Sequence, residues 1–258
     1  MYKGTYDGDK DEIKFVAKFN SNKELFSNYL SNFVNYQNVW MVRVTTKQFS
    51  TLSGRKVFTR SDCFLASINT NIDDLLEKND YLLSEEILDT NKIKYTKIPY
   101  SGISIKMTTS KRFQILKTGP NSFKSLFGSY ELGAGASLFC KRETELNKNP
   151  DLIKGWNSTI ENMTNYFSEI TNGNNSFYMN KEICKKIKNF SCDKVKSLII
   201  ENRDLQQKIF NGIGLYDEPY TALYFYHGDN IEKLTTIPFT VTTGSGRSKG
   251  DYTIVLKP

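Results

Sequence analysis

An aspartate, a Ser-x-Lys triplet and a later glutamate stand out because of the residues around them. Asp62 is the first acid after residues 39–61, a stretch with five basic residues and no acid. Ser104 and Lys106 lie within residues 90–130, where eight basic residues occur without an acid, and Glu131 is the first acid beyond. Carboxylates that hold Mg²⁺ against a phosphate, with a lysine beside them, are the groups that metal-assisted phosphodiester cleavage requires. The pattern therefore predicts a site of that kind.

Local patterns place the first three of these residues on strands. Asp62 stands at the start or bend of an apolar strand within residues 56–68, and Ser104 and Lys106 alternate with two isoleucines, which puts them on one face. Further strands are expected at residues 39–44, 113–117, 222–226, 239–242 and 252–256. Helices are expected over residues 21–36, 72–88, 121–132, 150–167, 181–190 and 193–210. This order predicts a mixed α/β (α+β) fold with a helical block in its C-terminal half, and argues against a helix bundle.

Composition limits the class of protein. The 258 residues are 38% hydrophobic and 13% aromatic, enough to bury a core, so we expect a single domain over residues 1–258 and exclude wholesale disorder. The chain has no apolar run of transmembrane length, its first residues lack the apolar core of a secretory signal, and its four cysteines form no CxxC. These features predict a cytoplasmic protein with reduced thiols. Its one histidine, His227, excludes a mechanism that needs two.

The net charge of +7 is unevenly distributed. Residues 39–61 contribute +5, residues 90–130 contribute +8 and residues 233–258 contribute +3, which leaves −9 for the rest. A basic surface assembled from separate segments predicts a polyanion partner, although solvated lysines on strand faces remain the alternative. A basic, hydroxyl-rich stretch at residues 242–250 suits phosphate contacts or groove entry, or else forms an ordinary hairpin turn. The expected DNA contacts are Arg60, Lys111, Arg112, Arg247 and Lys249.

The candidate residues resemble the motif of the PD-(D/E)xK nuclease superfamily, and of type II restriction endonucleases in particular. Asp62 matches the first aspartate of that motif and Lys106 matches its lysine. The chain departs from the pattern at Ser104, where the family usually has Asp or Glu, and at Ser61, where it often has Pro. Some restriction enzymes of this superfamily also carry Ser-x-Lys and take the missing carboxylate from the following helix. The resemblance spans roughly residues 21–132.

The resemblance implies a restriction-endonuclease-like central mixed sheet flanked by helices, with a catalytic core over residues 21–132 and a DNA-contacting elaboration over residues 150–258. It also implies that Asp62 and Glu131 bind Mg²⁺, that Lys106 orients the attacking water, and that Ser104 lines the site. Glu24, on the helix before the first strand, is the other candidate for the second carboxylate. The activity implied is sequence-specific hydrolysis of double-stranded DNA by a homodimer, leaving 5′-phosphate ends.

Other interpretations stay open. A base-excising glycosylase would need no metal and could use His227 or a tyrosine, whereas a non-catalytic nucleic-acid-binding protein would need only the basic stretches. Asp62 could pair with Arg60 or cap a turn, Lys106 could be a solvated lysine, and Glu131 could be a surface residue at a helix end. The small residues at 133–136 favour close packing over a nucleotide-binding loop, because the residues before them make a poor strand.

Overall fold

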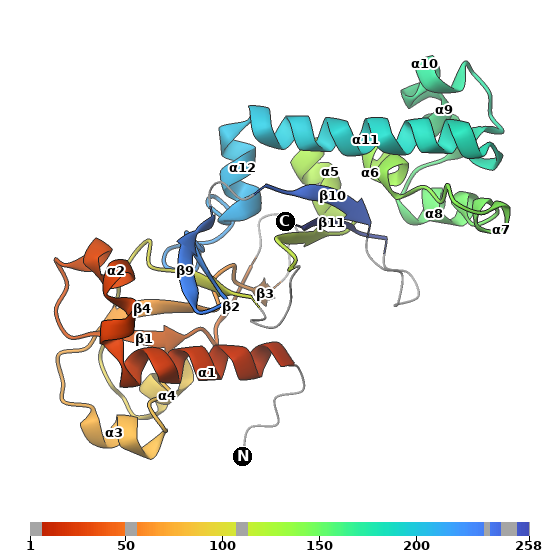
Figure 1. Cartoon of the computed structure of the whole chain (residues 1–258). Helices are drawn as coiled ribbons and strands as arrows, with labels where there is room; N and C mark the ends of the chain where they lie inside the picture. The colour runs from red at the N-terminus through yellow and green to blue at the C-terminus, as the bar shows by residue number, and fades with distance from the viewer. Residues whose placement is uncertain (1–6, 50–55, 107–112, 235–237, 244–251, 258) are drawn as a thin grey trace. The chain divides into compact units, whose positions relative to one another are not determined.

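The computed structural model describes residues 7–49, 56–106, 113–234, 238–243 and 252–257. The chain divides into two compact units, where we expected one domain (Figure 1). The first unit comprises residues 1–113 and 210–236, and the second comprises residues 114–209 and 237–258. The expected core of residues 21–132 coincides with neither, because the first unit begins before residue 21 and takes two strands from beyond residue 210.

The first unit is built on a mixed six-stranded sheet. Its strands run in the order β1-β4-β6-β8-β9, with β5 also paired to β4, and all pairs are antiparallel except β6 with β8. A separate antiparallel pair joins β2 to β3. The elements of this unit are α1 (Asp7–Ser21), η1 (Lys23–Phe26), α2 (Ser27–Leu30), η2 (Ser31–Phe33), β1 (Val39–Arg43), β2 (Lys47–Phe49), β3 (Lys56–Phe58), β4 (Cys63–Ser67), α3 (Asp73–Lys78), α4 (Glu85–Thr90), β5 (Thr96–Lys97), β6 (Ile103–Ile105), β8 (Tyr224–His227) and β9 (Asn230–Lys233).

Helices cover both faces of this sheet. On one face, α1 buries Phe15, Val16 and Phe19, whose helical spacing forms an apolar stripe, and Figure 1 shows α1 alongside β1 and β4. On the other face, α3 and α4 contribute apolar side chains to a second core. Alternation along β1 divides its side chains, so that Met41 joins the first core and Val42 the second. The fold is therefore the mixed α/β class that the sequence predicts.

The second unit packs helices with a three-stranded antiparallel sheet of order β10-β11-β7. Its glycines at 133 and 135 are sites of close packing, because a Cβ on Gly133 would lie 2.3 Å from the Trp156 ring. That confirms packing as the role of residues 133–136. The elements are β7 (Leu116–Thr118), α5 (Pro120–Phe127), α6 (Tyr130–Ser137), α7 (Glu143–Leu146), α8 (Asn149–Gly155), α9 (Ile160–Tyr166), α10 (Ser168–Thr171), η3 (Phe177–Met179), α11 (Lys181–Glu201), α12 (Arg203–Phe210), β10 (Thr240–Thr243) and β11 (Ile254–Lys257).

Several helices differ from those expected. The helix expected at residues 72–88 is divided into α3 and α4, because Asp80 and Tyr81 take positive φ angles of 51° and 62° that a right-handed helix cannot continue. Residues 23–33 form three short helical turns, and residues 181–201 form one helix instead of ending near 190. The expected helices also omit α1. None of the described helices has an apolar run of the length that a membrane span needs.

Candidate active site

Asp62, Ser104 and Lys106 lie together at one end of the sheet in the first unit. Asp62 directly precedes β4, whose Cys63 is the partner of Ile103 in β6. The Ser104 hydroxyl donates to Asp62 Oδ2 at 3.2 Å, and the backbone N–H of Ile105 donates to the same oxygen at 2.5 Å. The Lys106 Nζ in turn donates to Ser104 Oγ at 2.7 Å. The three residues therefore form one hydrogen-bonded line from carboxylate to amine.

Backbone hydrogen bonds fix the position of Asp62 from both sides. Its N–H donates to the Ile103 carbonyl at 2.8 Å, and its carbonyl accepts from Val44 at 2.9 Å. The two preceding N–H groups, of residues 60 and 61, both donate to the Tyr220 carbonyl at 3.1 Å. A carboxylate held by neighbouring strands in this way is pre-organised, as a binding or catalytic group must be.

Burial shifts the acid and the amine toward their neutral forms. It raises the pKa of Asp62, against the opposing effects of the Lys106 charge and the Ile105 N–H. It lowers the pKa of Lys106, and the Arg60 charge lowers it further while Asp62 opposes the change. Groups perturbed in this way gather at functional sites. A divalent cation would favour the ionised form of Asp62, and an amine with a lowered pKa is better able to accept a proton.

A second carboxylate reaches this site from α1. Glu12 and Asp62 both line a cavity of about 210 Å³, together with Asp9, Arg43, Val44, Thr59 and Ser61. Burial raises the pKa of Glu12 to about 7, the Asp62 charge raises it further, and Arg43 opposes the shift. Two carboxylates thus share one confined space. Sequence reasoning missed Glu12, although the apolar spacing of Phe15, Val16 and Phe19 was a signal for the helix that carries it.

Arg43 pairs with two acids of α1, Glu12 and Asp9. Its Nε donates to Glu12 Oε2 at 2.8 Å, and its Nη2 donates to Asp9 Oδ1 at 3.2 Å. Only 15% of the Arg43 side chain is exposed, against 20% of Glu12 and 39% of Asp9. Arg43 is also the register partner of Cys63, so its backbone lies next to Asp62 in the sheet.

The sequence offered two other candidate carboxylates, Glu131 and Glu24. Glu131 belongs to the second unit, at the first turn of α6, where its two oxygens accept from Ser158 at 2.8 Å and from Ser129 at 2.9 Å. Although burial acts to raise the pKa of Glu131, these hydrogen bonds lower it. Its carboxylate is thus engaged within its own unit, and its role as a metal ligand stays a prediction. Glu24 is an exposed residue of η1, and Glu12 takes the place expected for it beside Asp62.

The expected DNA contacts are only partly described. Arg60 is half-buried, and its charge affects the pKa values of both Asp62 and Lys106. Lys111, Arg112, Arg247 and Lys249 lie outside the described residues. The histidine, His227, ends β8 next to Lys106, whose N–H donates to the Tyr226 carbonyl at 2.9 Å. The Phe113 ring lies near both, 5.2 Å from the His227 ring and 6.0 Å from the Lys106 amine.

The donor set of the cavity fits a magnesium ion. Within the described ranges there is no group of three or more His, Cys, Asp or Glu side chains arranged to hold a metal. Mg²⁺ does not require one, because it keeps several waters and commonly binds one or two carboxylates and a substrate phosphate. Asp62 and Glu12 supply two hard oxygen donors on one cavity, and burial raises the pKa of both carboxyls.

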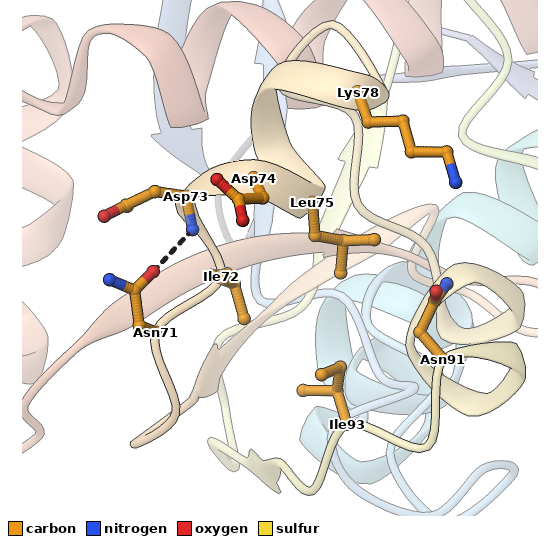
Figure 2. Close-up of a pocket in the computed structure, with 8 residues that line it drawn as sticks. All are labelled: Asn71, Ile72, Asp73, Asp74, Leu75, Lys78, Asn91 and Ile93. Carbon is orange, nitrogen blue, oxygen red and sulfur yellow. Dashed lines mark hydrogen bonds between the residues drawn. The ribbon is translucent and has the colours of Figure 1, made fainter.

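A larger cavity of about 570 Å³ lies at α3 in the same unit. Figure 2 shows the side chains of Ile72, Leu75 and Ile93 among those that line it, together with charged side chains from α3. Asp73 and Lys78 are exposed there, and the Asp73 N–H donates to Asn71 Oδ1 at 2.8 Å, which caps the turn before the helix. The charged side chains at this hollow are exposed and interact weakly through solvent, in contrast to the buried Asp62 carboxylate of the first cavity.

Comparisons of the chain with protein-family models, with curated proteins and with solved structures gave no match. What the chain does must therefore be argued from the geometry of Asp62, Ser104, Lys106 and Glu12.

Proposed function

We propose that this chain is a Mg²⁺-dependent endonuclease that hydrolyses phosphodiester bonds of double-stranded DNA, of the type II restriction kind. The observation that carries the proposal is the hydrogen-bonded line from Asp62 through Ser104 to Lys106 on adjacent strands, with the Glu12 carboxylate on the same cavity as Asp62. An acid pair can hold a metal ion, and an amine beside it can position a water against a phosphate.

In this proposal Asp62 and Glu12 hold the ion, and Glu131 is kept as a further candidate ligand. When bound, Mg²⁺ supplies positive charge that acidifies a water and balances the charge developing on the phosphate. Lys106 orients the attacking water and accepts its proton, while Ser104 holds the amine in place. The water oxygen forms a bond to phosphorus as the bond to the 3′-oxygen breaks. The 3′-oxygen takes a proton from solvent, and the 5′ end keeps the phosphate.

The topology of the first unit supports this assignment. Along the chain α1 comes before β1, β4 and β6, in which β4 pairs antiparallel with both other strands, although further short helices and strands lie between these elements in the sequence. A helix and three antiparallel strands are the part of the nuclease core that this unit matches. The acid-free basic stretches favour a DNA partner, with Arg60, Lys111, Arg112, Arg247 and Lys249 as proposed contacts. A homodimer acting on a palindromic site in the cytoplasm completes the proposal.

The direct test is cleavage of supercoiled plasmid DNA by the full chain, with Mg²⁺ and with EDTA. We expect linear or nicked products only with Mg²⁺, with ends that accept ligation because they carry 5′-phosphates. Strand breaks that persist in EDTA would contradict the proposal, and abasic sites formed in EDTA would point to base excision. DNA binding without any cleavage would favour the non-catalytic alternative.

The raised pKa of Glu12 predicts how stability depends on pH in the metal-free protein. The folded-state pKa of about 7 lies above the ordinary value of 4.5, so the unfolded chain loses its proton first as pH rises. The stability gained from protonated Glu12 is therefore complete below about pH 4.5 and is lost as the pH approaches about 7. We expect Glu12→Gln to melt ~2–4 °C above the wild type at pH 8 in EDTA, which corresponds to about 1 kcal/mol. At pH 4.5 the two should melt together.

Added Mg²⁺ should reverse this order at pH 8, because a ligand that binds only the folded wild type raises its melting temperature. The control is Glu77→Gln, which neutralises an exposed carboxylate on α3 and should leave both comparisons unchanged. If Glu12→Gln melted below the wild type at pH 8 in EDTA, the Glu12 charge would be stabilising and the argument wrong.

A further inference from the structure

The Arg43 guanidinium lies among the carboxylates of the cavity that we propose as the metal site. It donates to Glu12 and Asp9 at 2.8 and 3.2 Å and lines the same cavity as Asp62. A guanidinium and a magnesium ion both seek carboxylate oxygens, and Glu12 Oε2 already accepts the Arg43 Nε–H. Arg43 and a metal ion bound to Glu12 would therefore compete for the same carboxylate.

We propose that Arg43 is a phosphate-binding residue of the nuclease site, released from Glu12 when a divalent cation binds to Glu12 and Asp62. The released guanidinium then donates to the phosphate that the cation brings into the cavity. Metal binding and phosphate binding are coupled by this exchange of partners. The inference rests on the proposed nuclease function and names the residue that receives its substrate.

Charge balance in the cavity allows the exchange. Its lining includes three carboxylates, of Asp9, Glu12 and Asp62, and one guanidinium, of Arg43, so the formal charge with all of them ionised is −2. One divalent cation neutralises that charge without requiring Arg43 to leave the cavity. The phosphate then adds negative charge near Arg43, and charge-assisted bonds to a phosphate are the stronger kind of hydrogen bond.

The backbone at Arg43 need not move for the side chain to change partners. Its N–H donates to the Leu83 carbonyl at 2.9 Å, and Arg43 is paired with Cys63 in the sheet. The long arginine side chain can change rotamer while its backbone stays in place, and its planar guanidinium can donate to two phosphate oxygens at once. The contact with Asp9, which is 39% exposed, is screened by solvent and resists the turn only weakly.

The test measures Mg²⁺ binding by calorimetry at pH 8.5, without DNA, for the wild type, Arg43→Gln and Arg43→Lys. We expect Arg43→Gln to bind Mg²⁺ at least as tightly as the wild type, and up to a few-fold tighter, because a competing cation is gone. If Arg43 only braced α1 against β1, its loss would weaken Mg²⁺ binding. The two roles therefore predict opposite signs.

DNA binding is measured in the Lys106→Met background, which should bind without cutting. There, Mg²⁺ should tighten DNA binding ~10-fold, and adding Arg43→Gln should abolish this gain. Arg43→Lys keeps the charge but loses the fork, so it should retain part of the gain. It also serves as the second variant if Arg43→Gln folds poorly. A full Mg²⁺-dependent gain in both Arg43 variants would overturn the proposal.

The matched control is Lys18→Gln. It removes a 2.8 Å ion pair with Asp229, which also joins α1 to the sheet but lies outside the cavity. Lys18→Gln should change neither Mg²⁺ affinity nor the Mg²⁺-dependent gain in DNA binding. A wild type that neither binds Mg²⁺ nor cuts DNA would overturn the nuclease function itself. A wild type that does both, while Arg43→Gln binds Mg²⁺ more weakly and keeps the gain, would overturn only the role of Arg43.

Discussion

Replacing Lys106 with methionine should reduce the rate of Mg²⁺-dependent DNA cleavage by ~10³-fold or more, because proton transfer and charge stabilisation by one positioned side chain are worth that much. Methionine keeps the length and the apolar stem of lysine but lacks the amine that donates to Ser104 Oγ at 2.7 Å. DNA binding in EDTA should change little, since a single amine among many basic residues contributes little to it.

The same substitution should not unfold the protein. Burial lowers the pKa of Lys106, which means that the folded protein favours the uncharged form of this side chain. An apolar replacement of similar volume removes that cost, although it leaves the Ser104 hydroxyl with one partner fewer. We therefore expect Lys106→Met to melt within a few degrees of the wild type, so that lost activity reports on chemistry.

Lys94→Met is the matched control for this experiment. Lys94 comes from the same acid-free stretch but is exposed, so its loss should leave the cleavage rate unchanged. Asp62→Asn should match Lys106→Met in lost activity and should in addition lose Mg²⁺ binding. If folded Lys106→Met cleaved DNA at more than a tenth of the wild-type rate, Lys106 would have no essential role in the proposed reaction.

The part of the site that sequence could predict is the part that short-range rules determine. Alternation along a strand puts Ser104 and Lys106 on one face, and the absence of acids over residues 39–61 makes Asp62 conspicuous. Their convergence required only that two neighbouring strands pair, which β4 and β6 do through Cys63 and Ile103.

Glu12 depends on packing that no short pattern encodes. Its helix could be predicted from Phe15, Val16 and Phe19, yet its place beside Asp62 follows from where α1 crosses the end of β1 and from the pairing with Arg43. The reverse holds for Glu131, which is conspicuous in sequence as the first acid after a basic stretch. In the structure its carboxylate accepts hydrogen bonds from nearby serines at the start of α6.

The division into two units could not be predicted from the sequence patterns, because these patterns predict where strands form but not which strands pair. β8 lies more than a hundred residues beyond β6, yet pairs with it in parallel through Ser104 and Phe225. The segment leading into β8 also holds the site, because the Tyr220 carbonyl accepts from residues 60 and 61. Gly102 lies where this segment meets β6.

Replacing Gly102 with alanine should therefore lower the stability of the protein more than any of the other substitutions proposed above. An added Cβ would lie 1.7 Å from the Thr221 carbonyl oxygen and 2.7 Å from that of Pro219. Both atoms are backbone, so relief requires the segment around residue 220 to move. We expect a loss of about 3 kcal/mol or more in the free energy of unfolding, seen as a melting temperature lower by ~10 °C.

The expected damage extends to the proposed metal site, because a shift of residues 219–221 would displace the backbone hydrogen bonds that hold Arg60 and Ser61 just before Asp62. Folded Gly102→Ala should thus bind Mg²⁺ more weakly even well below its melting temperature. Gly119→Ala is the control, since its added Cβ would meet only the Tyr252 carbonyl oxygen, at an ordinary 3.9 Å. If Gly102→Ala melted at the same temperature as the wild type, β6 and the segment before β8 would not approach each other this closely. If Gly102→Ala were destabilised but bound Mg²⁺ normally, the segment around residue 220 would not be what holds Asp62 in place.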